Sequence, residues 1–344
     1  RWIVGLSNYS FNRDADDDIA LGALLADDMG LGKTFMSLSA IAEYYRRCSE
    51  KNEVKRPVLV VAPLSLLENW QDEVDKVFAT SPFNDIVVLQ ANADLKRFRI
   101  EGAGQETRQN ISSEDEDGTA SIRYALKTRA SNYEVDGLDQ PARLVLTTYR
   151  TLQDYQFSLC RIDWSFVIFD EAQNIKNPNA LQTRAAKGLK ARFTLAMTGT
   201  PVENELRDFW CLFDTARPGL LGSYQWFRQT YVAPIRGAGD EEKNRVRIEV
   251  GQSLRNRAAG LMLRRLKEDN LDGLPQKTIW VGKEAVDSNE KYSADMECTM
   301  AGLQKDRYDM VVGLTRAALG EEESRGAALK GLQALRAISL HPDC

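Results

Sequence analysis

The sequence predicts an α/β fold in which a doubly wound parallel sheet is covered by helices on both faces. Six short apolar runs recur between residues 22 and 199, and they do not alternate with polar residues. Strands of this kind are buried on both faces, as in a parallel sheet. Apolar residues at helical spacing follow the first two runs, so strands and helices alternate along the chain.

The predicted elements follow one another in chain order. The strands are the runs at 22–26, 57–62, 85–90, 143–149, 164–170 and 193–199. One helix is expected from Lys33 onward. A second is expected after Pro63, where Ser65 and Glu68 match the pattern of a capping box at its start.

Two further segments differ in composition from the strand and helix pattern. Residues 101–140 are polar and include the acidic run SSEDEDG at 112–118, which is typical of a surface insertion or a mobile loop. Beyond Pro201 the pattern becomes helical and aromatic. We therefore expect a helical appendage on the sheet.

Composition excludes several classes of protein. The 344 residues are 43% hydrophobic and 28% charged, which suits a globular chain of about two domains. The longest apolar runs fall far short of the ~20 residues of a membrane helix, and no charged segment leads into an apolar one at the N-terminus. Five scattered cysteines without a C-x-x-C pair indicate reduced thiols. We expect a soluble intracellular protein, in the cytoplasm or nucleoid of a prokaryote or in a eukaryotic nucleus.

The net charge of −5 argues against binding of nucleic acid through a positive charge on the whole chain, so any such contact must be local. One local candidate lies between Lys176 and Arg192, which holds five basic residues and no acidic one. Arg184, Lys187 and Lys190 recur every third residue, which predicts a basic stripe along one side of a helix. A solvated helix face explains the stripe as well as a contact to phosphate does.

The decapeptide LADDMGLGKT at 25–34 follows the first predicted strand. Its Gly32-Lys33-Thr34 matches the end of the P-loop pattern, but Asp27 stands where that pattern opens with glycine. Backbone N–H groups at a helix start can cradle phosphate where glycines leave room, while a lysine reaches the β- and γ-phosphates and a threonine hydroxyl binds Mg²⁺. The alternative is a helix cap with a chance GKT.

Two other motifs also follow predicted strands. FDEAQN at 169–174 places Asp170 to hold Mg²⁺ and Glu171 to polarise an attacking water, because ligands of open parallel sheets bind at the carboxyl ends of strands. A helix N-terminus is the alternative for this pair of carboxylates. In MTGTP at 197–201, the hydroxyls of Thr198 and Thr200 are expected to link the carboxylates to neighbouring parts of the chain. The alternative is a simple Gly-Pro turn.

Seven segments together resemble the first half of the SWI/SNF-type ATPases, the double-stranded-DNA translocases of helicase superfamily two. In chain order these are LADDMGLGKT, VVAPLSLLENW, TTYRTL, FDEAQNIKN, MTGTPVENEL, LMLRRLKED and LQALRAISLHP. In that family an acidic pair replaces the opening glycine, which accounts for Asp27. The resemblance implies a RecA-like, P-loop ATP-binding lobe at 1–208, a helical appendage and linker at 209–275, and a truncated second lobe from 276 to 344.

The resemblance also assigns roles to single residues. The ATP loop comprises Asp28, Met29, Gly30, Leu31, Gly32, Lys33 and Thr34. Catalysis falls to Lys33 and Glu171, Mg²⁺ binding to Thr34 and Asp170, and coupling of hydrolysis to movement to Gln173, Thr198 and Thr200. The motif residues expected at DNA are Pro63, Ser65, Thr147, Thr148 and Tyr149, and contacts to backbone phosphates would give no sequence preference.

The implied activity is ATP hydrolysis coupled to lobe movement on double-stranded DNA, with a nucleoprotein or protein complex as a further candidate partner. Two features of the family are missing: the glutamine-bearing segment that reads adenine, and the arginine-bearing final motif. Because the chain starts at Arg1 and ends at Cys344, we expect a fragment that is nearly inactive alone. An RNA-directed helicase and an ATP-gated switch without motor activity remain alternatives.

Overall fold

The computed structural model describes residues 1–11, 21–108, 122–201, 205–239, 242–270, 278–281, 284–287, 300–319 and 324–340. The chain divides into two compact units, Arg1–Leu271 and Asp272–Cys344. The first unit contains the predicted ATP loop and the other motifs predicted to form its site.

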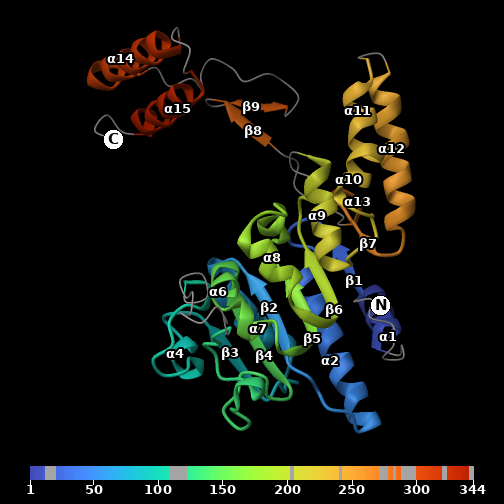
Figure 1. The fold of residues 1–344 in the computed structure, drawn as a ribbon. Helices are drawn as coiled ribbons and strands as arrows, with labels where there is room; N and C mark the ends of the chain where they lie inside the picture. The colour runs from blue at the N-terminus through green and yellow to red at the C-terminus, as the bar shows by residue number, and fades with distance from the viewer. Residues whose placement is uncertain are drawn as a thin grey trace, which may run out of the picture. The chain divides into compact units, whose positions relative to one another are not determined.

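A parallel sheet of seven strands, counted over the described residues, forms the centre of the first unit (Figure 1). In chain order the strands are β1 (Leu21–Leu25), β2 (Val58–Ala62), β3 (Asp85–Leu89), β4 (Arg143–Thr148), β5 (Asp163–Phe169), β6 (Lys190–Met197) and β7 (Met262–Leu263). Their spatial order is β3-β4-β2-β5-β6-β1-β7, and every neighbouring pair is parallel. The six predicted strands and the α/β class are confirmed, whereas β7 was not predicted because two residues carry no periodicity.

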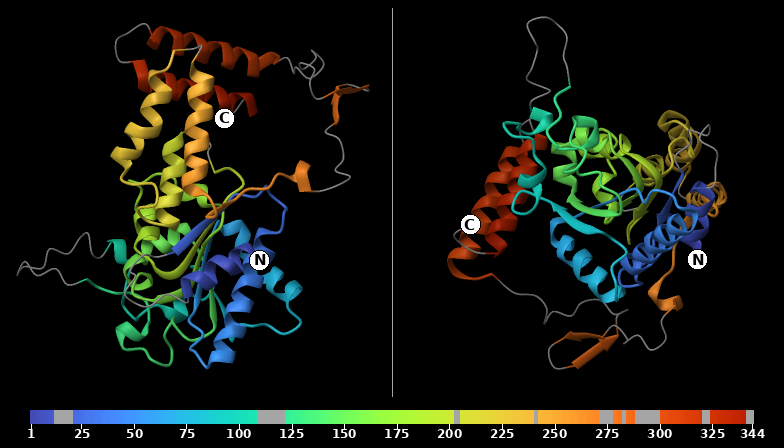
Figure 2. Two further views of the ribbon diagram at one scale, coloured as in Figure 1. Left: turned by 90° about the vertical axis from the view of Figure 1, so that its right-hand side faces the viewer. Right: turned by 90° about the horizontal axis from the view of Figure 1, so that it is seen from below.

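Helices cover both faces of this sheet, as Figure 2 shows from two further sides. On one face lie α1 (Trp2–Phe11), α2 (Lys33–Lys51) and α3 (Leu67–Val77), and on the other α6 (Tyr149–Asp154), α7 (Gln156–Leu159), α8 (Leu181–Lys187) and α9 (Leu206–Ala216). Successive strand residues enter opposite layers, so Leu24 packs with the second group and Leu25 with the first. Both are fully buried, which explains the unbroken apolar runs.

Glycine at position 22 allows α9 to lie directly against β1. A Cβ on Gly22 would fall 1.9 Å from the carbonyl oxygen of Ala216, the last residue of α9. No side chain fits in that space. Helix α9 is therefore part of the main layer over the sheet, although its residues lie in the segment predicted as an appendage.

The remaining helices of the first unit follow α9 in the chain. They are α10 (Tyr224–Phe227), the π-helical turn η4 (Arg228–Val232), α11 (Ala233–Gly237), α12 (Lys243–Ala258) and α13 (Lys267–Asn270). Smaller elements within the sheet region are η1 (Leu64–Leu66), α4 (Leu95–Phe98), η2 (Arg129–Ser131) and η3 (Ala172–Ile175). Strand β7 follows α12 and joins the edge of the sheet beside β1.

The second unit contains a hairpin and a pair of helices in its described part. Strands β8 (Thr278–Val281) and β9 (Glu284–Asp287) are antiparallel. Helix α14 (Gly302–Leu319) packs on α15 (Ser324–Leu340), and the side-chain amide of Gln304 donates a 2.8 Å hydrogen bond to the carbonyl of Ile338. Across the described parts of both units, we find no helix with the length and apolar character needed to cross a membrane.

Part of the described flanks of the predicted insertion packs into the core, so the expectation of a solvated or mobile segment was wrong for these residues. Ala125, Leu126 and Leu138 are fully buried. The segment was misread because these apolar residues form groups too short to show a strand or helix period. The acidic run at 112–118 lies outside the described residues.

A buried carboxyl group holds this insertion against the second helical layer. Glu106 accepts hydrogen bonds from the backbone N–H groups of Ala125 at 2.7 Å and Ser158 at 3.0 Å, and it also bonds to the Ser158 hydroxyl. Burial raises the pKa of Glu106, although these hydrogen bonds oppose the rise.

We expect Glu106→Ala to lower the free energy of unfolding by about 1–3 kcal/mol, because it leaves buried N–H groups without an acceptor.

Since the pKa of Glu106 is raised in the folded chain, the contribution of this carboxyl group to stability is greatest below the ordinary glutamate pKa and is lost as pH rises through the folded value. Urea unfolding at pH 5 and pH 8 tests this. The wild type should lose stability relative to Glu106→Gln between the two, and a parallel pH dependence would contradict the prediction.

Candidate nucleotide site

Three predicted motifs meet because the strands that precede them are neighbours. The loop after β1, the carboxylates after β5 and the threonines after β6 follow strands ordered β5-β6-β1 in the sheet. All three strands are parallel, so their carboxyl ends share one edge. Met29 lies close to MTGTP, since a Cβ on Gly199 would be 3.5 Å from its Cγ.

The loop after β1 has the backbone shape that phosphate binding requires. Gly30 and Gly32 adopt left-handed conformations, with φ of 84° and 76°, and Lys33 begins the nineteen-residue helix α2. The ammonium of Lys33 lies within the loop and donates to the carbonyl oxygens of Asp27 at 2.9 Å and Asp28 at 3.3 Å. A Cβ on Gly32 would meet only the Cβ of Phe35, at 4.0 Å. Space, glycines, helix N-terminus and cation all suit a bound phosphate.

Asp170 is the buried carboxylate of the site, with 7% of its surface exposed. Its Oδ2 accepts the indole N–H of Trp70 at 3.0 Å, and its Oδ1 accepts the backbone N–H of Glu171 at 3.0 Å. Burial raises the pKa of Asp170 and the charge of Glu171 adds to the rise, while the Trp70 hydrogen bond and the charge of Lys33 oppose it. A buried carboxylate beside a lysine suits a divalent cation bound with phosphate.

A line of hydrogen bonds joins the carboxylates to MTGTP. The side-chain amide of Gln173 donates to Glu171 Oε2 at 2.8 Å, and its oxygen accepts the Thr198 hydroxyl at 2.7 Å. Thr198 Oγ1 in turn accepts the backbone N–H of Thr200 at 3.1 Å. The backbone N–H of Thr198 donates to the carbonyl of Leu25 at the end of β1, which connects these hydrogen bonds to the strand that precedes the loop.

Glu171 has an unusual backbone conformation. Its φ of 49° and ψ of 54° lie in the left-handed region, which costs a residue with a Cβ about 1–3 kcal/mol. Two hydrogen bonds from residues that follow it hold it there, one from Gln173 to its side chain and one from the Asn174 side-chain amide to its carbonyl at 2.8 Å. Strain at a carboxylate beside a phosphate loop is the kind found at functional sites.

Sequence analysis missed how Asp27 is held. This residue is fully buried, and its carboxylate accepts the backbone N–H of Arg265 at 2.9 Å and the Arg265 guanidinium at 3.0 Å. The partners are 238 positions apart in the chain. LMLRRLKED contained the partner, but no local pattern connects it with Asp27. Position 27 thus binds an internal cation where the P-loop pattern has glycine.

The residues expected at DNA divide into two groups. Thr147 is fully buried and its hydroxyl donates to Leu89, while Tyr149 is buried and its hydroxyl donates 2.7 Å to the carbonyl of Asp170. Both side chains face the interior. Thr148 is half-buried and its hydroxyl accepts the backbone N–H of Thr151, capping α6.

Pro63 and Ser65 lie at the carboxyl end of β2. Pro63 precedes the 3₁₀ turn η1, and Ser65 is exposed within that turn. The predicted capping box is wrong: the residue preceding α3 is Leu66, and no side chain caps this helix. The intervening 3₁₀ turn moves the helix start beyond the reach of Ser65.

The predicted basic stripe does not lie along one helix. Helix α8 ends at Lys187, and Lys190 is the first residue of β6. Lys187 forms an ion pair with Asp214 and lies 4.8 Å from the centre of the Trp210 ring. Arg184 and Lys190 are exposed. The three-residue spacing was misread as helical because the turn at 188–189 has no sequence signal apart from one glycine.

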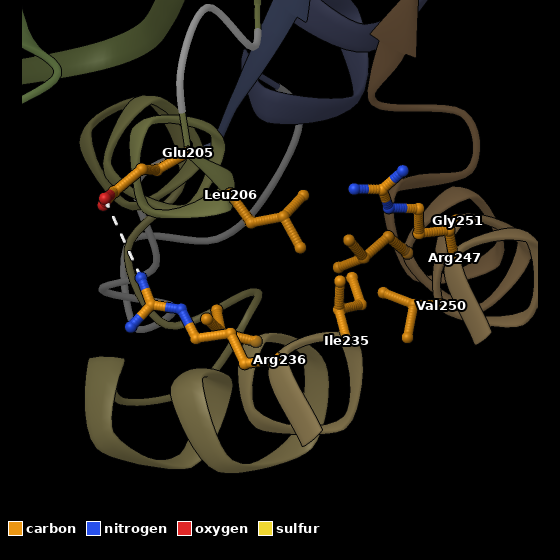
Figure 3. Close-up of a pocket in the computed structure, with 9 residues that line it drawn as sticks. Glu205, Leu206, Ile235, Arg236, Arg247, Val250 and Gly251 are labelled. Carbon is orange, nitrogen blue, oxygen red and sulfur yellow. Dashed lines mark ion pairs between the residues drawn. The ribbon is translucent and has the colours of Figure 1, made fainter. Parts of the chain in front are cut away.

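A separate apolar cavity of about 420 Å³ lies among the helices that follow the sheet (Figure 3). Glu205 and Arg236 form an ion pair of 3.8 Å at its rim. The lining residues are Glu205, Leu206, Val232, Ile235, Arg236, Arg247, Val250, Gly251 and Leu254. None of them is a predicted site residue, so this cavity is distinct from the nucleotide loop.

Comparison with known families supports the arrangement just described. A model of the SNF2-related domain matches residues 2–344. The chain belongs to this SNF2-related family. The resemblance inferred from the motifs is thereby confirmed.

Relatives of this SNF2-related chain occur in bacteria and eukaryotes. It is 38% identical to the Zorya protein ZorD of Escherichia coli over 93% of its length, and 30% identical to a putative ATP-dependent helicase/translocase, YwqA, of Bacillus subtilis over 93%. It is 26% identical to the DNA repair and recombination protein RAD26 of Saccharomyces cerevisiae over 94%. The chain spans only 26%, 28% and 29% of ZorD, YwqA and RAD26.

Solved structures agree with the RecA-like fold. The SWI2/SNF2 ATPase core of Sulfolobus solfataricus in complex with dsDNA matches 98% of this chain with a TM-score of 0.50 at 25% identity. The core domain alone matches 99% with a TM-score of 0.51 at 26% identity. This chain covers 56% and 55% of those chains.

Proposed function

We propose that this chain is the nucleotide-binding part of an ATP-driven translocase on double-stranded DNA. The observation that carries the proposal is the set of hydrogen bonds Glu171–Gln173–Thr198–Leu25, which joins the ends of β5, β6 and β1 and brings the phosphate loop, the two carboxylates and MTGTP together. Membership of the SNF2-related family and similarity to an ATPase core in complex with dsDNA favour DNA as the polymer.

Each residue of the site has a proposed role. Residues Asp28 to Thr34 bind the phosphates of ATP, with Lys33 as the cation, and Thr34 and Asp170 hold Mg²⁺. Glu171 orients and polarises the attacking water. Mg²⁺ held by these residues would supply positive charge that neutralises the phosphates. Trp70 fixes the orientation of the Asp170 carboxylate through its 3.0 Å hydrogen bond.

The coupling residues and the DNA candidates Pro63, Ser65 and Thr148 lie at the edge of the sheet formed by the carboxyl ends of the strands, whereas Lys190 opens β6 at the opposite edge. Gln173 and Thr198, with Thr200 beside them, transmit the state of the site because a change at Glu171 alters their hydrogen bonds. The accessible candidates for phosphate contact are Pro63, Ser65 and Thr148 near the strand ends and Arg184 and Lys190 farther along the chain. Thr147 and Tyr149 support these contacts from the interior.

The division of the chain into an ATP lobe, an appendage with a linker, and the start of a second lobe is part of this proposal. Its first segment, and the second as far as Leu271, lie within one compact unit, and α9 and β7 both pack on the sheet. Arginine from a second lobe would complete the catalytic site. A nucleoprotein or protein complex is the proposed target of the motor.

ATP turnover by the full-length protein, compared without polymer and with duplex DNA, single-stranded DNA or RNA, tests the function. All four arms share one salt concentration, because phosphate contacts make nucleic-acid affinity salt-dependent. We expect duplex DNA to stimulate turnover most. Stimulation by RNA alone would favour an RNA-directed helicase, and turnover indifferent to every polymer would favour an ATP-gated switch.

A further inference from the structure

The segment after β7 runs beside the ATP loop as a continuation of the sheet. The backbone N–H of Ala26 donates to Leu263 at 2.7 Å, and that of Asp28 donates to Arg265 at 3.1 Å. One step farther, the N–H of Lys267 donates to the side chain of Asp28 at 3.0 Å. Residues near the end of the first unit are thus bonded directly to the loop.

Arg265 fixes the position of this segment. Its guanidinium and backbone N–H both bond to the buried carboxylate of Asp27, and its Nη2 lies 3.2 Å from the sulfur of Met36 in α2. A two-point bond of this kind holds a side chain and its backbone together. The backbone of Lys267, two residues farther along the chain, is therefore held at a defined position.

The side chain of Lys267 lies over the glycine of the loop. A Cβ on Gly30 would be 3.4 Å from both Cε and Nζ of Lys267. The side chain is half-buried, and none of the ion pairs formed within the described parts of the chain includes it. A second ammonium therefore stands at the loop, in addition to Lys33.

We propose that Lys267 binds the terminal phosphate of ATP as a second cation of the site. This inference rests on the proposed function, because it requires the loop to bind ATP. An ammonium contacts phosphate as a compact point charge, and a partly buried position limits screening by solvent. The closely packed Gly30 and the Asp27–Arg265 bond keep Lys267 near the loop before ATP arrives.

The position of Lys267 gives this contact a second consequence. It lies in α13, four residues before the end of the first unit at Leu271. A bond from Lys267 to the terminal phosphate adds to the hydrogen bonds that already hold this segment at the loop, and loss of that phosphate removes the added bond. The occupancy of the ATP site thereby acts on the connection to the second unit.

Nucleotide binding by full-length Lys267→Met tests the inference without relying on turnover. Methionine removes the charge but retains the backbone N–H that donates to Asp28. We expect the Kd for ATP to rise about tenfold, the Kd for ADP to change less, and Lys267→Arg to restore ATP binding in large part. Fluorescent ATP and ADP analogues measure the Kd, and thermal unfolding of the nucleotide-free proteins should agree between wild type and variant.

Two control variants separate this inference from the function itself. Arg264→Met removes an exposed cation of the same segment and should leave both Kd values unchanged. Lys33→Ala should abolish ATP binding. Wild-type ATP affinity in Lys267→Met, equal losses for ATP and ADP, or an equal effect of Arg264→Met would overturn the role of Lys267 alone. A wild-type protein that binds no ATP would overturn both the function and the inference.

Discussion

Lys33→Ala is expected to abolish measurable ATP binding, whereas Glu171→Gln is expected to bind ATP and lose turnover by a factor of about 10² to 10⁴. Lys33 lies inside the loop, bonded to two loop carbonyls, where the phosphates would attract its charge. Glu171 lies outside the loop and is bonded to Gln173. The first variant removes a phosphate ligand, and the second removes only the group that polarises water.

The measurements are equilibrium binding of ATP and steady-state turnover by the full-length protein. Glutamine at position 171 retains the size of glutamate and an oxygen that can accept from Gln173, so a folding defect is not expected. Thermal unfolding without nucleotide is the control for both variants. Wild-type turnover by Glu171→Gln would show that another residue activates the water.

Arg265→Ala is expected to lower the free energy of unfolding of the first unit by about 3 kcal/mol, because it leaves the fully buried Asp27 without its cation. Breaking one partner of a buried pair costs about 3–5 kcal/mol, and we expect the lower end because the Arg265 side chain is 36% exposed, so water can reach the site. Urea unfolding at pH 7 measures the effect.

Asp27→Asn and Arg264→Ala are the matched variants for this pair. Asparagine retains an oxygen for the Arg265 backbone N–H, so its cost should be smaller than that of Arg265→Ala. Arg264 is exposed, and truncating it should change stability by no more than about 0.5 kcal/mol. Equal effects of Arg264→Ala and Arg265→Ala would contradict a buried pair at Asp27.

The main strands of the sheet could be predicted because each is buried on both faces and its sequence is therefore apolar without interruption. In β2, five consecutive residues from Val58 to Ala62 are fully buried, and the sequence there is correspondingly apolar throughout. Strand β7 has only two residues, both half-buried, so it shows no apolar run of this kind. Its place beside β1 comes from hydrogen bonds to a segment more than two hundred positions away, Leu24 N–H to the Leu261 carbonyl among them.

The candidate site was predictable where one short stretch carries both the turn and the chemistry. LADDMGLGKT contains the two glycines in left-handed conformation and the lysine that begins α2. Errors arose where spacing alone was used. Lys190 fell at the helical spacing of Arg184 but opens β6, because parallel pairing with β5 begins at Asp163 and Lys190.

By itself the sequence determined the α/β class, the six main strands, the glycine turn before α2 and the position of the carboxylates after β5, because local periodicity and turn chemistry specify burial and backbone conformation within a few residues. Only the tertiary structure decided that Trp70 orients Asp170, that Arg265 neutralises Asp27 and that Lys267 reaches Gly30. The two residues of each pair lie far apart in the chain, 100 positions for Trp70 and Asp170 and 238 positions for Asp27 and Arg265. Strand order and register bring them together, and both depend on how the whole sheet packs, which no short stretch of sequence encodes.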